Sequence, residues 1–212
     1  MVGIGASAGG LDALRQLFST MPADCGMAFV VVQHLSPDHV SVMDELLGKY
    51  TQLPVAVASN EVSVEPGKIY LIPPRAEMII SCGRLLLTDR DARQSVFLPI
   101  DSFFRALGDD LGPRAVAVVL SGTGSDGSRG IRAVHAAGGT VMAQDLDSAE
   151  FSSMPRTAID TGVVDVVGTL DVLRSELLAL SATGLLDTTS LSPPLESMFD
   201  VLRHETGVDF SQ

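Results

Sequence analysis

The sequence predicts an α/β fold: a doubly wound, mostly parallel sheet with helices on both faces and a small antiparallel β excursion. Two observations lead to this prediction. The runs AFVVVQ (28–33) and AVAVVL (115–120) are continuously apolar apart from the final Gln33, as strands are when helices cover both faces of a parallel sheet. These runs alternate along the chain with segments whose apolar residues recur at helical spacing. Strands and helices in alternation are the pattern of an α/β domain.

The chain begins with a strand–helix–strand unit. We expect a short buried strand over residues 2–5, a helix with one apolar stripe over residues 11–21, and a second strand over residues 28–33. Further elements are expected in this order: a helix over 40–50, a strand over 55–58, a helix over 99–111, a strand over 115–120, a helix over 128–137, a strand over 140–143, and helices over 155–161 and 170–180.

The antiparallel excursion is expected within residues 63–88. Three β-rich runs occur there in succession, KIYLIPP, EMIISC and RLLLT. Pro-Pro and Cys-Gly turn signals separate them, and closely spaced strands joined by short turns are typical of antiparallel pairing.

Composition excludes several classes of protein. The 26 acidic and 14 basic residues give a formal net charge of −12, which argues against nucleic acid or an anionic membrane surface as a partner. No apolar segment approaches the roughly 20 residues that a membrane span needs, and no signal peptide is present, so we expect no membrane insertion and a cytoplasmic location. Cys25 and Cys82 are far apart and form no metal-ligand pattern, so neither a metal nor a cofactor is expected.

The chain is expected to divide into three parts. Residues 1–182 form the α/β domain, and residues 183–194, TGLLDTTSLSPP, are rich in Thr, Ser and Pro and are expected to be a linker. Residues 195–212 have the apolar spacing of an amphipathic helix that begins a further domain. The strand that starts directly after Met1 also suggests a piece of a longer protein.

The opening stretch GIGASAGG fits two motifs with different chemistries. Gly3, Gly5 and Ala8 spell GxGxxA, a dinucleotide-binding fingerprint in which the backbone approaches a pyrophosphate at a helix N-terminus. Gly5, Ser7 and Gly9 spell GxSxG, in which a nucleophilic serine is exposed on a sharp turn between a strand and a helix. The stretch alone does not decide between them.

The loops after the next strands decide in favour of the serine. A dinucleotide site expects an acid at the end of the second strand, where this chain has Gln33 and His34. A serine nucleophile expects a nearby imidazole, which His34 supplies, and a carboxylate to orient it, which Asp126 supplies in the loop SGTGSDG. In an open parallel sheet these loops meet at the carboxyl ends of the strands.

Each of the three residues also has a structural interpretation. Ser7 could cap a helix, His34 could be a hydrogen-bonded residue at a strand end, and Asp126 could be a turn or cap residue. Their joint placement at three adjacent strand ends favours catalysis. The chain order Ser, His, Asp differs from that of α/β-hydrolases, in which the acid precedes the histidine, so a different scaffold is expected.

Several long motifs resemble a known family. GIGASAGGLDAL, VVVQHLSPDH, GKIYLIPP, LSGTGSDGSRGIRAVHAAGG and SMPRTAIDTGVVD resemble, in this order, the catalytic domain of the chemotaxis protein-glutamate methylesterases, over about residues 2–180. The resemblance implies that Ser7 is the nucleophile, His34 the base and Asp126 the group that orients it. It also places Ala8 and Thr123, where many members have threonine and methionine, near the oxyanion, with main-chain N–H groups of Ala8, Thr123 and Gly124 as candidate donors.

The resemblance implies a serine esterase in signal transduction. Its substrate would be a methylated glutamyl residue in the cytoplasmic domain of a methyl-accepting chemoreceptor, with methanol as product and glutamine deamidation left open. LESMFDVLRHETGVDFSQ (195–212) resembles the opening helix of the chemotaxis receptor methyltransferases, which implies a methylesterase fused to a methyltransferase domain. The alternatives are a catalytically weak or silent docking or regulatory module with the same fold in a multidomain signalling protein, and an enzyme that uses a nicotinamide dinucleotide.

Overall fold

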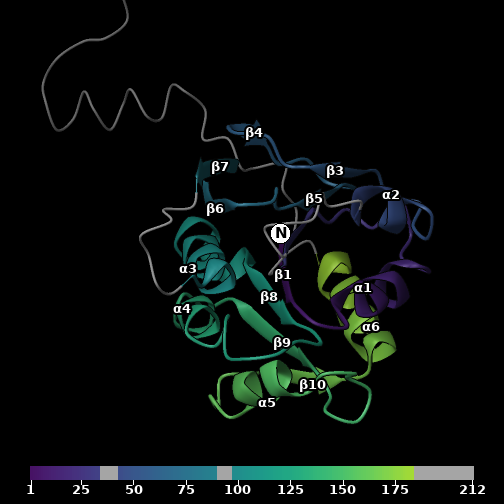
Figure 1. Ribbon diagram of the computed structural model, residues 1–212, viewed down its shortest axis with the longest axis vertical. Helices are drawn as coiled ribbons and strands as arrows, with labels where there is room; N and C mark the ends of the chain where they lie inside the picture. The colour runs from purple at the N-terminus through teal and green to yellow at the C-terminus, as the bar shows by residue number, and fades with distance from the viewer. Residues whose placement is uncertain (34–42, 90–96, 184–212) are drawn as a thin grey trace, which may run out of the picture.

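The computed structural model describes residues 1–33, 43–89 and 97–183. Two sheets and the helices around them make up this part of the chain (Figure 1). Its elements, in chain order, are β1 (Val2–Ala6), α1 (Gly10–Phe18), β2 (Phe29–Gln33), α2 (Met43–Gly48), β3 (Val55–Val57), β4 (Val62–Ser63), β5 (Ile69–Leu71), β6 (Ala76–Ser81), β7 (Arg84–Asp89), α3 (Pro99–Leu111), the 3₁₀ turn η1 (Gly112–Arg114), β8 (Val116–Val119), α4 (Gly130–Ala136), β9 (Thr140–Gln144), α5 (Ser153–Ile159), β10 (Val166–Gly168) and α6 (Leu170–Ala182).

The large sheet confirms the predicted fold class. Its strand order is β10-β9-β8-β1-β2-β5-β3, and every pair in it is parallel. From β1 the chain crosses toward β2, and from β8 it crosses the opposite way toward β9 and β10. The strand order therefore reverses between β1 and β8, and a crevice for ligands is expected at their carboxyl ends.

Helices cover both faces of this sheet, as the apolar strands predict. Alternate side chains of each strand enter two separate cores because successive side chains of a strand point to opposite faces. One core joins the sheet to α1, α2 and α6, and the other joins it to α3, α4, α5 and the small sheet. Figure 1 shows α1 beside α6 on one side of the sheet, and α3 beside α4 on the other.

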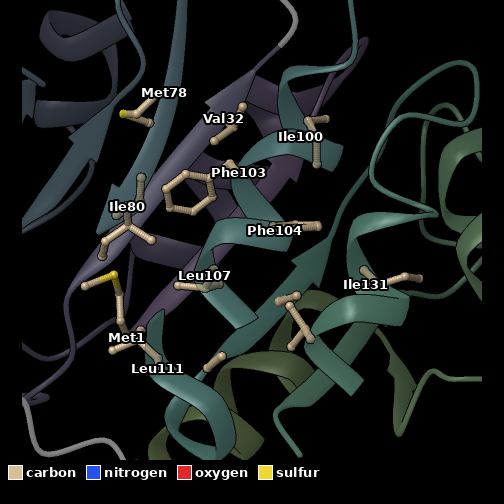
Figure 2. Close-up of a cluster of buried hydrophobic side chains, with 14 of the residues drawn as sticks. Met1, Val32, Met78, Ile80, Ile100, Phe103, Phe104, Leu107, Leu111 and Ile131 are labelled. Atoms are coloured by element: carbon tan, nitrogen blue, oxygen red, sulfur yellow. The ribbon is translucent and has the colours of Figure 1, made fainter. Parts of the chain in front are cut away.

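Helix α3 packs directly on the central strand β1. A Cβ added to Gly3 would lie 2.8 Å from Leu107 Cδ2, and one added to Gly5 would lie 2.5 Å from Ile100 Cγ2. Figure 2 shows this core, with Phe103 and Leu107 of α3 between the strands and the small sheet. The glycines of the opening motif thus let the helix approach the strand that leads to Ser7.

The expected antiparallel excursion is confirmed only in part. The second and third β-rich runs form β6 and β7, which pair antiparallel, with β4 on the other edge of β7. The first run, KIYLIPP, forms β5 instead, which lies in the large sheet, parallel to β2 and β3. All three residues of β5 are buried, whereas burial alternates with exposure at the end of β6, so only β5 is covered on both faces.

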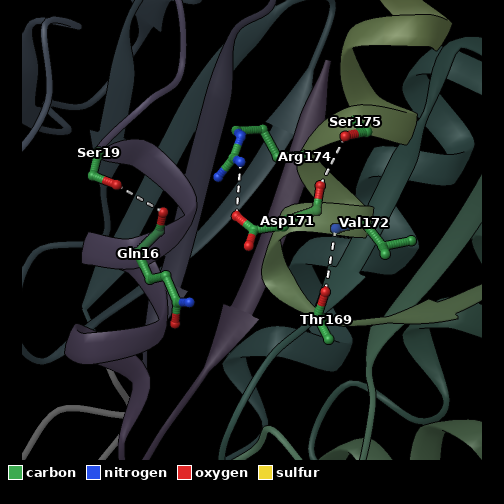
Figure 3. Close-up of polar contacts among 7 residues, drawn as sticks. All are labelled: Gln16, Ser19, Thr169, Asp171, Val172, Arg174 and Ser175. Carbon is green, nitrogen blue, oxygen red and sulfur yellow. Dashed lines mark hydrogen bonds and ion pairs between the residues drawn. The ribbon is translucent and has the colours of Figure 1, made fainter.

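Other differences are small. The helix expected over 11–21 ends at Phe18, and the hydroxyl of the next residue, Ser19, donates to Gln16 O (Figure 3). Strand β10 is an addition to the expected elements. Its three residues lie at the sheet edge and are only partly buried, so the sequence carries little pattern from which to predict it. It leads into α6, whose first turn is capped by Thr169 Oγ1, which accepts from Val172 N at 3.4 Å (Figure 3).

Candidate active site

The candidate site lies at the carboxyl ends of β1 and β8. A cavity of about 230 Å³ opens there, and its lining includes both Ser7 and Asp126. The other lining residues are Phe97, Leu98, Ile100, Thr123, Gly124, Ser125 and Met154. The structure thus brings two of the three predicted residues to one cavity, from loops that are 119 positions apart in the sequence numbering, Ser7 to Asp126.

Ser7 directly follows β1 and is held by its main chain. Its N–H donates to Ser121 O at 3.1 Å, and its carbonyl accepts from Gly10 N at 2.9 Å. Gly9 at the start of α1 has a φ of +70°, a left-handed conformation that favours glycine, and no side chain caps this helix. Ser7 is therefore not the helix cap, which leaves its hydroxyl free of that structural role.

Close contacts around Gly122 bring the two strand ends together. A Cβ on Gly122 would lie 2.7 Å from Met154 Cε and 3.0 Å from Ser7 Cβ. Only a glycine allows the loop after β8 to approach the serine this closely without a shift of its neighbours. Met154, which belongs to the SMPR motif, packs over Gly122 and forms one wall of the cavity.

Asp126 is buried, and its two oxygens are held by the first turn of α3. Oδ2 accepts from Ile100 N at 3.0 Å, and Oδ1 accepts from Asp101 N at 2.9 Å. Pro99 precedes these residues and has no N–H to satisfy. Asp126 thus caps α3 from a distant loop. It is a cap residue, as the sequence allows, but it caps α3 and not α4, the helix that follows its own loop. Each carboxylate oxygen retains a second lone pair for a further donor.

Burial raises the pKa of Asp126 above its ordinary value of 3.8. The hydrogen bonds from Asp101 N and Ile100 N oppose this rise, because they favour the ionised form, and the negative charge of Asp101 adds to it. A buried carboxylate of this kind gains from a cationic or hydrogen-bonding partner, such as an imidazole.

His34 lies outside the described residues, as do residues 184–212, so the structure does not place the predicted base. Its neighbour Gln33 ends β2, the strand beside β1. Gln33 Nε2 donates to Ser7 O at 3.4 Å, while Gln33 Oε1 is buried and finds no hydrogen-bond partner among the described residues. In the strand order β8-β1-β2, the carboxyl ends of the three strands that precede Asp126, Ser7 and His34 lie side by side, as predicted.

The main-chain N–H groups near the serine differ in their availability. Gly124 N donates to Ser153 Oγ at 3.1 Å, and that hydroxyl in turn donates to Gly122 O at 3.3 Å. The N–H groups of Ala8 and Thr123 have no acceptor among the described residues. Ala8 and Thr123 are therefore better placed than Gly124 to supply N–H groups to a bound oxyanion.

A second cavity, of about 330 Å³, lies where a dinucleotide would bind, beside the first turn of α1. Its lining includes Gly9, Asp12 and Glu150. A Cβ on Gly9 would lie 2.8 Å from Glu150 Oε2, so a carboxylate occupies the space in which a dinucleotide fold places a phosphate. Asp12 is paired with Arg15, which also lines this cavity, so it is the Glu150 carboxylate that disfavours a phosphate ligand here.

Some residues that shape the site carry no functional signal in the sequence. Asp101 is 4% exposed and binds the loop after Asp126, yet in the sequence it is an ordinary acid in the first turn of a helix. Ser153 and Met154 lie within the SMPR motif, but nothing in that motif shows that they contact the Gly122 loop. Such contacts between distant segments leave no local signal.

Neither a metal centre nor a membrane span is found in the part of the chain that the structure describes. Residues 1–33, 43–89 and 97–183 contain no group of three His, Cys, Asp or Glu side chains that could hold a metal ion. No helix in these ranges is long and apolar enough to span a membrane.

The amino-acid sequence is similar to those of several other bacterial proteins. It is 34% identical over 182 residues to the protein-glutamate methylesterase/protein-glutamine glutaminase of group 3 operon from Rhizobium meliloti, which covers 85% of this chain and 51% of that protein. It is 48% identical over 123 residues to a 104.1 kDa protein in the hypE 3′ region of Rhodobacter capsulatus, which covers 58% of this chain and 13% of that protein. The chain thus spans about half of the first relative and a small part of the second.

The fold agrees with this similarity. The crystal structure of the Thermotoga maritima CheB methylesterase catalytic domain matches with a TM-score of 0.77 at 27% identity, over 84% of this chain and 97% of that domain. A family model described as CheB methylesterase matches residues 2–177, which include Ser7, His34 and Asp126. The chain therefore belongs to the CheB methylesterase family.

Proposed function

We propose that this domain is a protein-glutamate methylesterase that hydrolyses glutamyl methyl esters through an acyl-enzyme on Ser7. In this mechanism His34 is the general base and Asp126 orients it. The observation that carries the proposal is the shared cavity: Ser7 and Asp126 line it from adjacent strands, and the strand on the other side of β1 ends one residue before His34.

The reaction proceeds in two halves. His34 removes the proton from Ser7 Oγ as that oxygen attacks the ester carbonyl, and then returns the proton to the departing methoxy oxygen, so methanol leaves and Ser7 carries the acyl group. Water then attacks this ester with His34 as base, which releases the glutamate carboxylate and restores the Ser7 hydroxyl. Asp126 stabilises the imidazolium that forms in each half.

The charge that develops on the carbonyl oxygen needs hydrogen-bond donors. We assign this role to the main-chain N–H groups of Ala8 and Thr123, because neither has an acceptor among the described residues. Helix α1 begins at Gly10, three residues after Ser7, and the partial positive charge of its N-terminus adds to the stabilisation. Neither donor depends on a side chain, so the change from threonine to Ala8 and from methionine to Thr123 leaves both N–H groups in place.

The substrate is expected to be the cytoplasmic part of a methyl-accepting chemoreceptor, which places the enzyme in the cytoplasm. The same acyl-enzyme forms from a glutamine side chain if ammonia leaves in place of methanol, and the relative in Rhizobium meliloti is named as a glutaminase as well as a methylesterase. Residues 195–212 lie outside the described residues, and a fused methyltransferase domain stays part of the proposal.

Methanol release from a methylated receptor fragment tests the proposal. Ser7→Ala should lower the turnover of the 1–212 chain by about 10⁴- to 10⁶-fold, the range found when a serine nucleophile is removed from a hydrolase. Ser125→Ala is the matched control, because Ser125 lines the same cavity without a proposed role, and it should remain within a fewfold of wild type. Wild-type turnover in Ser7→Ala would contradict the assignment. Ammonia release from an unmethylated glutamine-containing fragment tests the glutaminase activity.

A further inference from the structure

A second buried carboxylate lies directly behind Asp126. Asp101, in the first turn of α3, is 4% exposed, and its Oδ1 accepts from Arg129 N at 2.9 Å and from Gly130 N at 2.8 Å. These two N–H groups belong to the start of α4, which follows the Asp126 loop after three residues. Asp101 therefore ties the far end of that loop to α3.

Asp101 and Asp126 together form a closed arrangement. Asp126 on the loop accepts N–H groups from the start of α3, and Asp101 on α3 accepts N–H groups from the end of the same loop. The loop is thus attached to α3 at both of its ends. Neither carboxylate belongs to an ion pair in the described part of the chain.

The packing around this arrangement leaves little room for movement. A Cβ on Gly127 would lie 2.8 Å from Ile100 Cγ2, and one on Gly130 would lie 2.6 Å from Phe104 Cβ and 2.9 Å from Asp101 O. The loop and α4 therefore touch the α3 backbone itself. A carboxylate is an expensive group to bury without a cation, and an apolar residue would fill the same space more cheaply. A carboxylate at position 101 is explained by the two N–H groups, of Arg129 and Gly130, that it holds in place.

We propose that Asp101 is a positioning residue for the esterase reaction: it fixes the loop 126–130 against α3 so that the Asp126 carboxylate faces the cavity that contains Ser7. The proposal rests on the function proposed above. Asp101 does not line the cavity, so it acts through Asp126 rather than on substrate.

Two variants of Asp101 separate its hydrogen bonds from its charge. Asp101→Ala removes the acceptor of both N–H groups and should lower kcat by about 100-fold with little change in KM, the size of effect that a displacement of about 1 Å has in a catalytic site. Asp101→Asn retains an Oδ1 that can accept both N–H groups, so kcat should return to within a fewfold of wild type. Equal losses in both variants would contradict a positioning role that works through these hydrogen bonds.

Asp110 provides a matched control on the same helix. Its carboxylate also accepts two main-chain N–H groups, those of Cys82 and Gly83 in the turn between β6 and β7, at the opposite end of α3. Asp110→Ala should lower the melting temperature but leave kcat within a fewfold of wild type. If Asp110→Ala and Asp101→Ala lose activity equally, general destabilisation explains both and the proposal fails.

Amide hydrogen exchange tests the positioning without an activity assay. In Asp101→Asn, exchange at Ile100, Arg129 and Gly130 should match wild type. Asp101→Ala should speed exchange at Ile100 as well as at Arg129 and Gly130, because Asp126 moves with the loop. Faster exchange at Arg129 and Gly130 alone would refute the link to Asp126. If the wild-type chain releases no methanol, the proposed function fails, and this exchange pattern still decides whether Asp101 holds Asp126 in place.

Discussion

Replacement of Asp126 by alanine should damage both the stability and the chemistry of this domain. The two oxygens of Asp126 accept the N–H groups of Ile100 and Asp101, which are 0% and 4% exposed. A buried N–H group that loses its acceptor costs about 1–3 kcal/mol, so the two together cost about 2–6 kcal/mol. Removal of the buried carboxylate offsets part of this loss of unfolding free energy, because burial disfavours the charged form of Asp126.

We therefore expect a net loss near the lower end of that range, about 2 kcal/mol, which corresponds to a fall of about 4–8 °C in melting temperature for a domain of this size. The loss of the group that orients the base should lower kcat by about 10⁴-fold, as it does in serine proteases. Thermal unfolding followed by circular dichroism and methanol release from a methylated receptor fragment measure the two effects.

Asp165→Ala is the control for this experiment. Asp165 Oδ2 accepts from the buried Val141 N at 2.8 Å, at the opposite end of the sheet from the cavity. The control should lose about 1–3 kcal/mol of stability with kcat unchanged. An Asp126→Ala variant that retains activity within about tenfold of wild type would refute the proposed role of Asp126, since orientation of the base accounts for a far larger factor. A wild-type melting temperature would refute the cap of α3.

Two further predictions concern packing and pH. Gly5→Ala should destabilise the domain by about 1–3 kcal/mol in urea denaturation, because the new Cβ would lie 2.5 Å from Ile100 Cγ2. The control Gly48→Ala adds a Cβ that meets nothing within 4 Å and should change stability by no more than about 1 kcal/mol. Equal effects of the two substitutions would contradict the close contact of β1 and α3. The pKa of Asp126 is raised in the folded state, so between its ordinary value of 3.8 and that raised value the folded protein binds more protons than the unfolded one, and the contribution of Asp126 to stability falls as pH rises. The free energy of unfolding of wild type minus that of Asp126→Ala should therefore decrease across this range, and a flat difference would show that burial does not perturb the carboxyl.

Much of the fold follows from local patterns in the sequence. The strands β1, β2 and β8 are apolar apart from Gln33 at the end of β2, and this alone indicates a sheet covered on both faces. Parallel strands have their following loops at one edge of the sheet, so the strand pattern is sufficient to place Ser7 and Asp126 at the same edge. That β1 and β8 are neighbours there is a property of the folded sheet. The signal is strong because burial on both faces restricts every position of these strands.

Short elements are harder to assign. Strand β5 has three residues, and its apolar character is equally compatible with an antiparallel partner, so its place between β2 and β3 depends on the whole sheet. Strand β10 is short and half-exposed, so it carries almost no pattern at all. The same is true of Asp101, whose sequence position is that of any acid at a helix start.

The α/β class, the order of the main elements and the loops that carry Ser7, His34 and Asp126 can all be predicted from the amino-acid sequence, because periodicity and turn residues are local properties. The roles of Asp126 at the start of α3, of Asp101 at the end of the loop and of Ser153 as acceptor for Gly124 N emerge only from the folded chain. These contacts join residues at least 25 positions apart, and the packing of α3 and α4 on the sheet selects which of many compatible partners meet.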